Sequence, residues 1–339
     1  MTVRIAVIGA GIMGADHARI VAEDLPGATL QVICDPSVER AGRVADACGA
    51  LHTATDARAV VDRADVDAVI IASPDSTHAT LSLACIGARK PVLCEKPLSQ
   101  SSRECLEVIA AEIAAGRRLV QLGFMRRFDQ SYVEMKAALA TGVLGRALMM
   151  HNFHRNMENP AADFTAAMAI TNSAPHEFDV ARFVLGIDFT AISAFQPKRS
   201  DALVAPVFMV LETDDGQLVN IEINNNAAYG YDVRGELVGE KGSIALNTPS
   251  HSRLDLPLAQ IIAHAPDWRP RYGEAYRRQN RAFLTFVQTG EFPASAADCW
   301  DGYAAAIVAE TGMRALSRGC RTTVEMAERP SFYRKEHFT

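Results

Sequence analysis

Two short polar segments of the chain carry side chains that can move a proton. In the first segment Lys96 lies between Glu95 and Pro97, and the proline restricts the backbone so that the lysine projects in a defined direction. A lysine held beside a reacting hydroxyl can hydrogen-bond to it and assist its proton loss. The same tripeptide also occurs as an ordinary exposed turn, so the residues alone leave both interpretations open.

The second segment contains His176, which directly follows Pro175. Because proline is tolerated in the first turn of a helix, the sequence predicts a helix that begins near residues 172–174. Asn172 and His176 are four residues apart and can then point to one face of it. Histidine is the most common general base in enzymes. The structural alternatives are a helix-capping Asn172 and a His176 that is simply buried in the core.

A glycine-rich loop near the start of the chain indicates the cofactor. An apolar run over residues 3–8 is followed by Gly9-Ala10-Gly11-Ile12-Met13-Gly14 and then by a predicted helix. Glycines in this order let the backbone turn tightly and approach a pyrophosphate at the helix N-terminus, and the last one lets the helix pack closely on the sheet. We therefore predict a dinucleotide site.

Asp35 ends the second predicted strand, about 20 residues past the glycines, where an acid accepts hydrogen bonds from the adenosine ribose. A carboxylate there would repel a 2′-phosphate. No basic residue follows it directly, and the first one along the chain is Arg40. The sequence therefore favours NAD over NADP.

These residues need a scaffold, and the first 122 residues predict one. Apolar runs at 67–72, 91–94 and 119–122 alternate with predicted helices at 38–48, 75–88 and 101–115. This alternation predicts a doubly wound parallel sheet, in which ligands bind beyond the carboxyl ends of the strands. The residues expected at the cofactor are Gly9, Gly11, Ile12, Met13, Gly14, Asp35, Ser73, Pro74, His78, Glu95 and Lys96, although surface or capping roles are also expected for His78 and for His17.

The pattern changes after residue 123. Alternating apolar and polar residues predict strands at 146–154, 189–196, 205–212, 217–225 and 231–238, and helices at 129–140, 173–185, 272–289 and 298–317. His151 and His154 are three apart on one strand and should face opposite sides. We thus predict an α/β chain with a Rossmann domain over residues 1–122 and an α+β domain over 123–339 with an open, mainly antiparallel sheet.

The net charge and the cysteine spacing argue against several classes of protein. A formal charge of −6 and a pI of about 5.9 give no attraction to nucleic acid or to an anionic membrane surface. The seven cysteines form no CxxC pair and no metal-ligand spacing with histidine, so we expect buried thiols in a reducing cytoplasm and no metal. A small-molecule enzyme fits these properties.

The combination of motifs resembles a known family. The glycine loop, the segment Cys94-Glu95-Lys96-Pro97, residues 123–129 and the segment His176-Glu177-Phe178-Asp179 together resemble the Gfo/Idh/MocA oxidoreductases, and within them the bacterial inositol 2-dehydrogenases. The resemblance extends over nearly the whole chain. It implies a Rossmann domain, a second domain with an open sheet, a homotetramer assembled through that sheet, and NAD-dependent oxidation of a ring hydroxyl of a cyclic polyol to a ketone.

The resemblance also implies roles for residues. It makes Lys96 and His176 catalytic and places Arg126, Asn156 and Tyr231 around the polyol. Its third catalytic residue is an aspartate where this chain has Asn172, and an amide orients a neighbour without supplying charge. Asp179 is the candidate replacement acid, or else a structural partner. The departure keeps other substrates open, namely another inositol isomer, an aldopyranose, or a keto-sugar reduced in the opposite direction. A separate alternative is a regulator that binds NAD and sugar without turnover.

Overall fold

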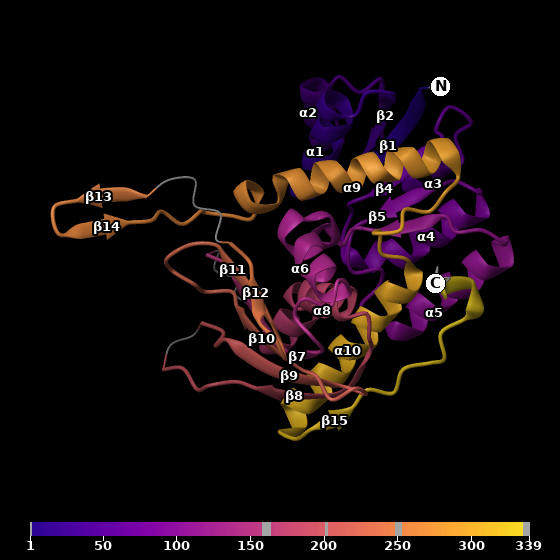
Figure 1. Cartoon of the computed structure of the whole chain (residues 1–339). Helices are drawn as coiled ribbons and strands as arrows, with labels where there is room; N and C mark the ends of the chain where they lie inside the picture. The colour runs from indigo at the N-terminus through magenta and orange to yellow at the C-terminus, as the bar shows by residue number, and fades with distance from the viewer. Residues whose placement is uncertain (1, 158–163, 201–202, 248–252, 335–339) are drawn as a thin grey trace. The chain divides into compact units, whose positions relative to one another are not determined.

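The computed structural model describes residues 2–157, 164–200, 203–247 and 253–334 of the chain. Figure 1 shows its helices and strands, coloured by residue number. The chain divides into two compact units. The first unit contains residues 1–128, 276–306 and 327–339, and the second contains 129–275 and 307–326. A single boundary at residue 123 does not describe this division, because two late segments return to the N-terminal unit.

The first unit is built on a six-stranded sheet with the strand order β3-β2-β1-β4-β5-β6. All neighbouring strands run parallel. The order changes direction between β1 and β4, which confirms the doubly wound topology. The strands are β1 (Val3–Ile8), β2 (Ala28–Cys34), β3 (His52–Ala54), β4 (Ala68–Ile71), β5 (Val92–Cys94) and β6 (Val120–Leu122). All residues of β4 are buried, as its uninterrupted apolar run predicted.

The helices of this unit begin and end where local chemistry allows. Ser37 and Ser101 cap the N-termini of α2 and α5, and Gly49 and Gly116 end the same helices in the left-handed conformation. The sequence pattern did not reveal β3 or α3, which are only three and five residues long. The helices are α1 (Ile12–Arg19), α2 (Val38–Cys48), α3 (Ala57–Val61), α4 (His78–Gly87) and α5 (Ser102–Ala115).

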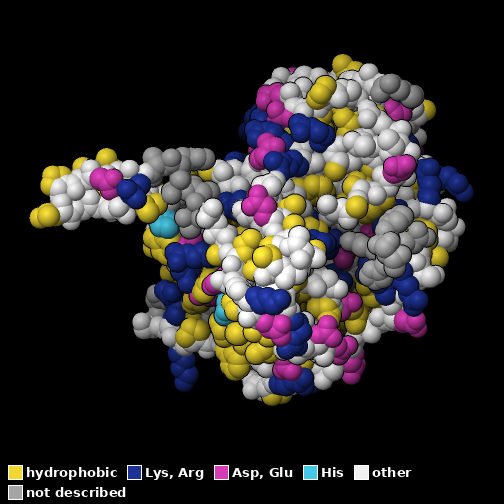
Figure 2. Space-filling view, viewed as in Figure 1, with side chains coloured by type: hydrophobic (Ala, Val, Ile, Leu, Met, Phe, Trp, Pro, Cys, Tyr) yellow, Lys and Arg dark blue, Asp and Glu magenta, His cyan; other side chains and the backbone are white. Residues whose placement is uncertain are grey.

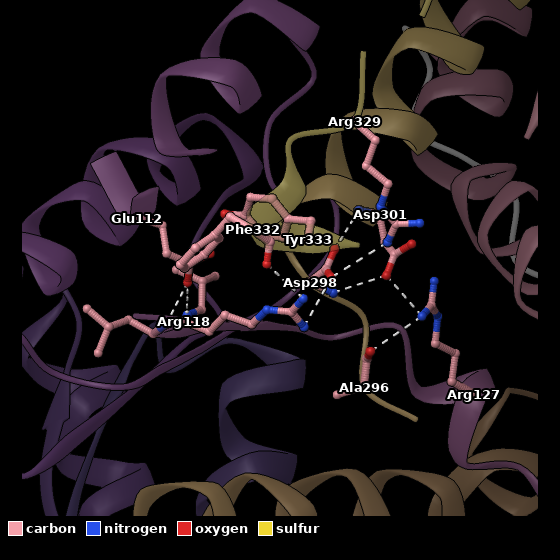
Figure 3. Close-up of polar contacts among 11 residues, drawn as sticks. Glu112, Arg118, Arg127, Ala296, Asp298, Asp301, Arg329, Phe332 and Tyr333 are labelled. Atoms are coloured by element: carbon pink, nitrogen blue, oxygen red, sulfur yellow. Dashed lines mark hydrogen bonds and ion pairs between the residues drawn. The ribbon is translucent and has the colours of Figure 1, made fainter. Parts of the chain in front are cut away.

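A buried polar cluster attaches the returning segments to this sheet (Figure 3). Glu112 of α5 accepts hydrogen bonds from the backbone N–H groups that begin β6 and from the Tyr333 hydroxyl. Arg118 Nη1 lies 3.4 Å from Asp298 Oδ2, and both side chains belong to the same unit. The C-terminal segment is therefore part of the N-terminal fold.

The second unit contains a seven-stranded sheet with the order β12-β11-β7-β10-β9-β8-β15. Strands β7 and β10 run parallel, and the other neighbouring pairs are antiparallel. The sheet is thus mainly antiparallel, as expected, with one parallel pair at its centre. Its strands are β7 (Ala147–Arg155), β8 (Phe189–Phe195), β9 (Val207–Thr213), β10 (Leu218–Asn224), β11 (Asp232–Gly239), β12 (Ser243–Ala245) and β15 (Thr322–Thr323).

The two faces of this sheet differ. Helices cover one face. Gly312 belongs to α10 (Cys299–Arg318), and a side chain there would meet Ile170 and Ile192 at 3.2 Å. Ile192 belongs to β8, so α10 packs directly on the sheet. On the other face Phe208 and Leu218 are each 40% exposed. The helices of this unit are α6 (Gln130–Ala140), α7 (Ala166–Met168), α8 (Pro175–Leu185) and the later part of α10 (Cys299–Arg318), while α9 (Arg269–Thr289) begins in this unit and continues into the first.

A separate hairpin, β13 (Leu254–Leu256) and β14 (Ala259–Ile261), has every strand residue exposed. Figure 2 shows hydrophobic side chains at its tip. Across the part of the chain that the structure describes, none of the helices combines the length and the apolar character that a membrane span requires.

Candidate active site

The glycine loop leaves no room for side chains at two of its positions. Gly9 has φ +100°, and a Cβ there would lie 2.5 Å from the Ala72 carbonyl oxygen. A Cβ at Gly14 would lie 1.7 Å from the carbonyl oxygen of Gly9. At Gly11, by contrast, a Cβ would meet no atom within 4 Å, so this position faces open space. Gly11 also starts α1 without a side-chain cap, which leaves the first backbone N–H groups to bind an anion.

Asp35 directly follows β2 and lies beside the glycine loop. Its Oδ2 accepts a hydrogen bond of 2.9 Å from the backbone N–H of Ala10, within the glycine loop. Its Oδ1 accepts from the backbone N–H of Ser37 and from the Arg40 guanidinium. Burial alone would raise the pKa of Asp35, but these donors outweigh it and hold the pKa below the ordinary value. The carboxylate is therefore ionised, and the loop and acid together fit a dinucleotide.

His78 connects the ends of two strands rather than lying at the surface or at a cap. Its Nδ1 lies 2.6 Å from the Pro97 carbonyl oxygen and its Nε2 lies 2.8 Å from the Ser73 carbonyl oxygen. His78 is almost completely buried. Since both ring nitrogens face protein carbonyls, His78 holds the Ser73-Pro74 turn against the segment after Lys96, which corrects the expected surface or capping role.

His17 is likewise buried. Its Nε2 lies 2.9 Å from Glu95 Oε1, and its Nδ1 lies 3.1 Å from Asn280 Oδ1. The surface or capping role expected for His17 is thus wrong, because it joins α1 to the end of β5 and to α9. Glu95 also accepts a hydrogen bond of 3.3 Å from the backbone N–H of Lys96. The Glu95 carboxylate therefore contacts the protein on both oxygens.

Lys96 follows the buried end of β5, and the Lys96–Pro97 peptide bond is cis. Burial lowers the pKa of Lys96 below its ordinary value, and the charge of Arg126 lowers it further, while Asp75 and Glu95 oppose the shift. Arg126 is itself buried in a short 3₁₀ helix, Met125–Phe128. The first unit thus brings two predicted site residues, Lys96 and Arg126, close enough to interact electrostatically.

In the second unit His176 is the second residue of α8, and Pro175 takes the first position. Asn172 does not cap this helix, since the N-cap is Ala174 and no side chain caps it. Asn172 instead belongs to a π-helical turn, Ala169–Ser173, and its Oδ1 accepts a hydrogen bond of 2.8 Å from the Thr171 hydroxyl. Such turns often occur at functional sites. The helix predicted over residues 173–185 is α8, which begins at Pro175, two residues later than predicted.

Sequence reasoning did not select His154 for the site. Its Nδ1 lies 3.1 Å from Glu177 Oε1, and the Glu177 side chain is fully buried. The His154 ring lies 6.3 Å from that of His176 and 6.0 Å from that of Tyr231, measured between centroids. On the opposite face of β7, His151 hydrogen-bonds to Asn220, which confirms the predicted division of the two histidines.

Asn156 lies just past the end of β7 and joins the same region. Its Nδ2 donates a hydrogen bond of 2.7 Å to Asn225 Oδ1, which also accepts from the Ser173 hydroxyl at 3.3 Å. Asn156 is thereby linked to the turn that carries Asn172. The second unit therefore contains two sets of contacts among predicted site residues. His176 and Tyr231 lie around His154, and Asn156 is linked through Asn225 to the turn that carries Asn172.

Both halves of the chain match models of one family. The model described as "Oxidoreductase family, NAD-binding Rossmann fold" matches residues 3–124, and the model described as "GFO/IDH/MocA C-terminal domain" matches residues 132–245. The first match ends at residue 124 and the second begins at residue 132, both close to the change of pattern at residue 123.

Relatives match over almost the full length. The chain is 46% identical over 339 residues to inositol 2-dehydrogenase 2 of Saccharopolyspora erythraea, with 98% of each chain covered. It is 40% identical over 333 residues to inositol 2-dehydrogenase of Streptomyces avermitilis, with 97% of this chain and 96% of the relative covered. The crystal structure of myo-inositol dehydrogenase from Lactobacillus casei in complex with NAD(H) and myo-inositol superposes with a TM-score of 0.93 at 29% identity, with 98% of this chain and 100% of that chain covered. On these matches, the chain belongs to the Gfo/Idh/MocA oxidoreductase family.

Proposed function

We propose that this chain oxidises one ring hydroxyl of an inositol to the keto-inositol, with NAD as the hydride acceptor. The observation that carries the proposal is that a chain aligned almost end to end with inositol 2-dehydrogenases has both Lys96 and His176. Each of them lies among buried polar groups: Lys96 near Arg126, and His176 near His154 and Tyr231.

The close approaches at Gly9 and Gly14 in the first unit support a cofactor site at the glycine loop. The backbone of residues 9–14, with Ile12 and Met13 in the first turn of α1, would hold the pyrophosphate, and Asp35 Oδ2 would bind the adenosine ribose. Ser73 and Pro74 would border the dinucleotide. NAD, when bound, accepts a hydride from the carbon that bears the reacting hydroxyl.

The chain's own residues then handle the proton. His176 takes the proton of the hydroxyl as the carbon–hydrogen bond breaks, so one proton and one hydride leave and a C=O bond forms. Lys96 hydrogen-bonds to the same oxygen and stabilises the charge that develops on it. Asn172 orients the substrate or the imidazole without charge, and Arg126, Asn156 and Tyr231 bind the remaining hydroxyl groups.

The direct test is to replace Lys96→Ala and His176→Ala and to follow NADH absorbance with myo-inositol. We expect each substitution to lower kcat by roughly 10²- to 10⁴-fold, the usual contribution of a proton-transferring side chain, while NADH binding measured by fluorescence stays intact.

Lys241→Ala and His52→Ala are the matched controls, because both side chains lie at exposed positions. They should leave turnover unchanged. Full turnover in Lys96→Ala or His176→Ala, with normal cofactor binding, would remove those residues from the mechanism.

One observation favours a second substrate class. Asn172 lacks the carboxylate of the family aspartate, so the site offers one charge fewer to orient the hydroxyls of the sugar. Another inositol isomer, an aldopyranose or a keto-sugar reduced in the opposite direction would then be the better substrate. Initial rates on a panel of these compounds with NAD and NADH distinguish them, and a regulator without catalysis would bind NADH and turn over none.

The same proposal includes the assembly and location of the protein. The exposed face of the seven-stranded sheet, with Phe208 and Leu218 each 40% exposed, supports a homotetramer formed through that face. Six of the seven cysteines are buried or half-buried as free thiols, which supports a cytoplasmic location.

A further inference from the structure

Arg40 lies against the carboxylate expected to bind the ribose of the cofactor. Its Nη2 donates a hydrogen bond of 2.8 Å to Asp35 Oδ1, and its Nε donates one of 3.1 Å to the same oxygen. The Asp35 side chain is only 7% exposed, whereas that of Arg40 is 52% exposed. A solvent-facing guanidinium thus lies directly beside a nearly buried carboxylate.

The two oxygens of Asp35 have separate partners. Oδ2 accepts from the backbone N–H of Ala10, next to the glycine loop, and Oδ1 accepts from the backbone N–H of Ser37 and from Arg40. A carboxylate has about four acceptor positions. Oδ2 can therefore still receive a ribose hydroxyl while Arg40 stays on Oδ1.

This arrangement changes the charge that a 2′-phosphate would meet. An isolated Asp35 carboxylate repels such a phosphate, but the paired guanidinium cancels its charge. A guanidinium carries five N–H donors in a planar fork that suits phosphate oxygens. Among the residues that the structure describes, the hydrogen bonds of the Arg40 side chain use only Nε and Nη2, so Nη1 remains for another acceptor.

We propose that Arg40 sets the cofactor selectivity of this chain and lets it use NADP as well as NAD, by binding the 2′-phosphate of the adenosine ribose. NAD remains the better cofactor, because Asp35 stays in place and the exposed Glu39 adds a second negative charge in the first turn of α2. Measurements of turnover test this inference only if the proposed function holds, whereas measurements of cofactor binding test it independently.

The test measures kcat/KM for both cofactors with the accepted polyol, and the dissociation constants of NADH and NADPH without substrate by nicotinamide fluorescence. Wild type should bind and use NADP. Arg40→Gln should lower kcat/KM for NADP and weaken NADPH binding by roughly 10- to 100-fold, the usual range for a lost charge-assisted hydrogen bond, while the NAD values change less than about threefold.

Two further variants sharpen the result. Glu39→Gln should improve NADPH binding by about twofold to fivefold, because it removes an exposed and therefore screened negative charge. Arg43→Gln removes the same charge as Arg40→Gln from an exposed position one turn along α2, and it should change neither cofactor.

The inference is overturned if wild type binds no NADPH, or if Arg40→Gln weakens NADH and NADPH equally. Equal losses would mean that Arg40 only positions Asp35. If no polyol is oxidised with either cofactor, the proposed function fails, but the two dissociation constants still decide whether Arg40 recognises the phosphate.

Discussion

Two regions of the molecule obtain their shape in different ways. The first, called the cofactor end here, is the glycine loop of residues 9–14 with Asp35, and the second is the polar cluster of His154, His176 and Tyr231 beside α8. At the cofactor end the shape comes from the backbone: the Cα of Gly14 approaches the Gly9 carbonyl so closely that one methyl group would lie 1.7 Å from its oxygen. Beside α8 the shape comes from side chains of separate segments, including His154 from β7, His176 from α8 and Tyr231, which directly precedes β11.

This difference explains why the glycine loop leaves a signal in the sequence that the side-chain cluster beside α8 does not. A backbone clearance admits glycine only, so it leaves a fixed spacing in the sequence. A cluster of side chains can keep its geometry when one polar group replaces another of similar size, as Asn172 would do for the aspartate that the resemblance implies. We therefore expect mutations at the cofactor end to act through shape and mutations beside α8 to act through charge.

The largest effect is expected for Gly14→Ala. The added methyl group overlaps the Gly9 carbonyl, so α1 must move away from β1 and the pyrophosphate position is lost. We expect NADH affinity to fall by more than about 100-fold, together with a lowered midpoint of urea unfolding. Fluorescence titration and urea denaturation measure the two quantities.

Gly42→Ala is the control for this substitution. Gly42 lies inside α2, and a Cβ there meets no atom within 4 Å, so alanine should stabilise the protein by about 0.5–1 kcal/mol through helix propensity. If Gly14→Ala is equally well tolerated and binds NADH normally, the backbone clearance does not govern the cofactor end.

An intermediate effect is expected for Asn172→Asp. The new carboxylate would favour the protonated form of His176 and so raise its pKa, which makes it a stronger base. We expect kcat with myo-inositol to rise by roughly 3- to 30-fold at alkaline pH. Because only neutral His176 can accept a proton, the rising limb of the pH profile should also move to higher pH.

Asn172→Ala separates charge from shape, since it removes the amide without adding a carboxylate. It should lower kcat and leave the position of the rising limb unchanged. A pH profile of Asn172→Asp that coincides with that of wild type would show that residue 172 does not act on the imidazole through charge.

A last effect, on stability rather than on catalysis, concerns Asp298 in the side-chain cluster of the first unit (Figure 3). Burial, reinforced by Asp301, raises the pKa of Asp298 to about 7 against the lowering influence of Arg118. The folded state then holds a proton that the unfolded state has released between about pH 4 and pH 7, so this contribution to stability is lost as pH rises. Relative to Asp298→Asn, wild type should lose on the order of 2 kcal/mol between pH 5 and pH 8.

Urea denaturation at the two pH values measures this difference, and Asp255→Asn on the exposed hairpin is the control. The comparison between pH values cancels any constant cost of the substitution. Parallel behaviour of wild type and Asp298→Asn would mean that the carboxyl is ionised throughout, held by Arg118 and its neighbours.

Much of the fold was predictable because its signals are local. The apolar run of β4, the serine that caps α2 and the glycine that ends it each depend on neighbours a few residues away. The short elements β3 and α3 were missed since three to five residues carry too little periodicity. The return of the C-terminal segment to the first sheet has no local signal at all.

The sequence by itself determined the parallel sheet and the glycine loop with Asp35 at its edge, because spacing along the chain encodes strand, turn and helix. It also supplied Lys96 and His176 as the candidates for proton transfer. Only the tertiary structure decided that Arg40 rests on Asp35, that Glu177 contacts His154, and that His17 and His78 are buried. Those contacts depend on how the elements pack against one another and on which buried charges then need a partner. The order of residues within one segment specifies neither of these.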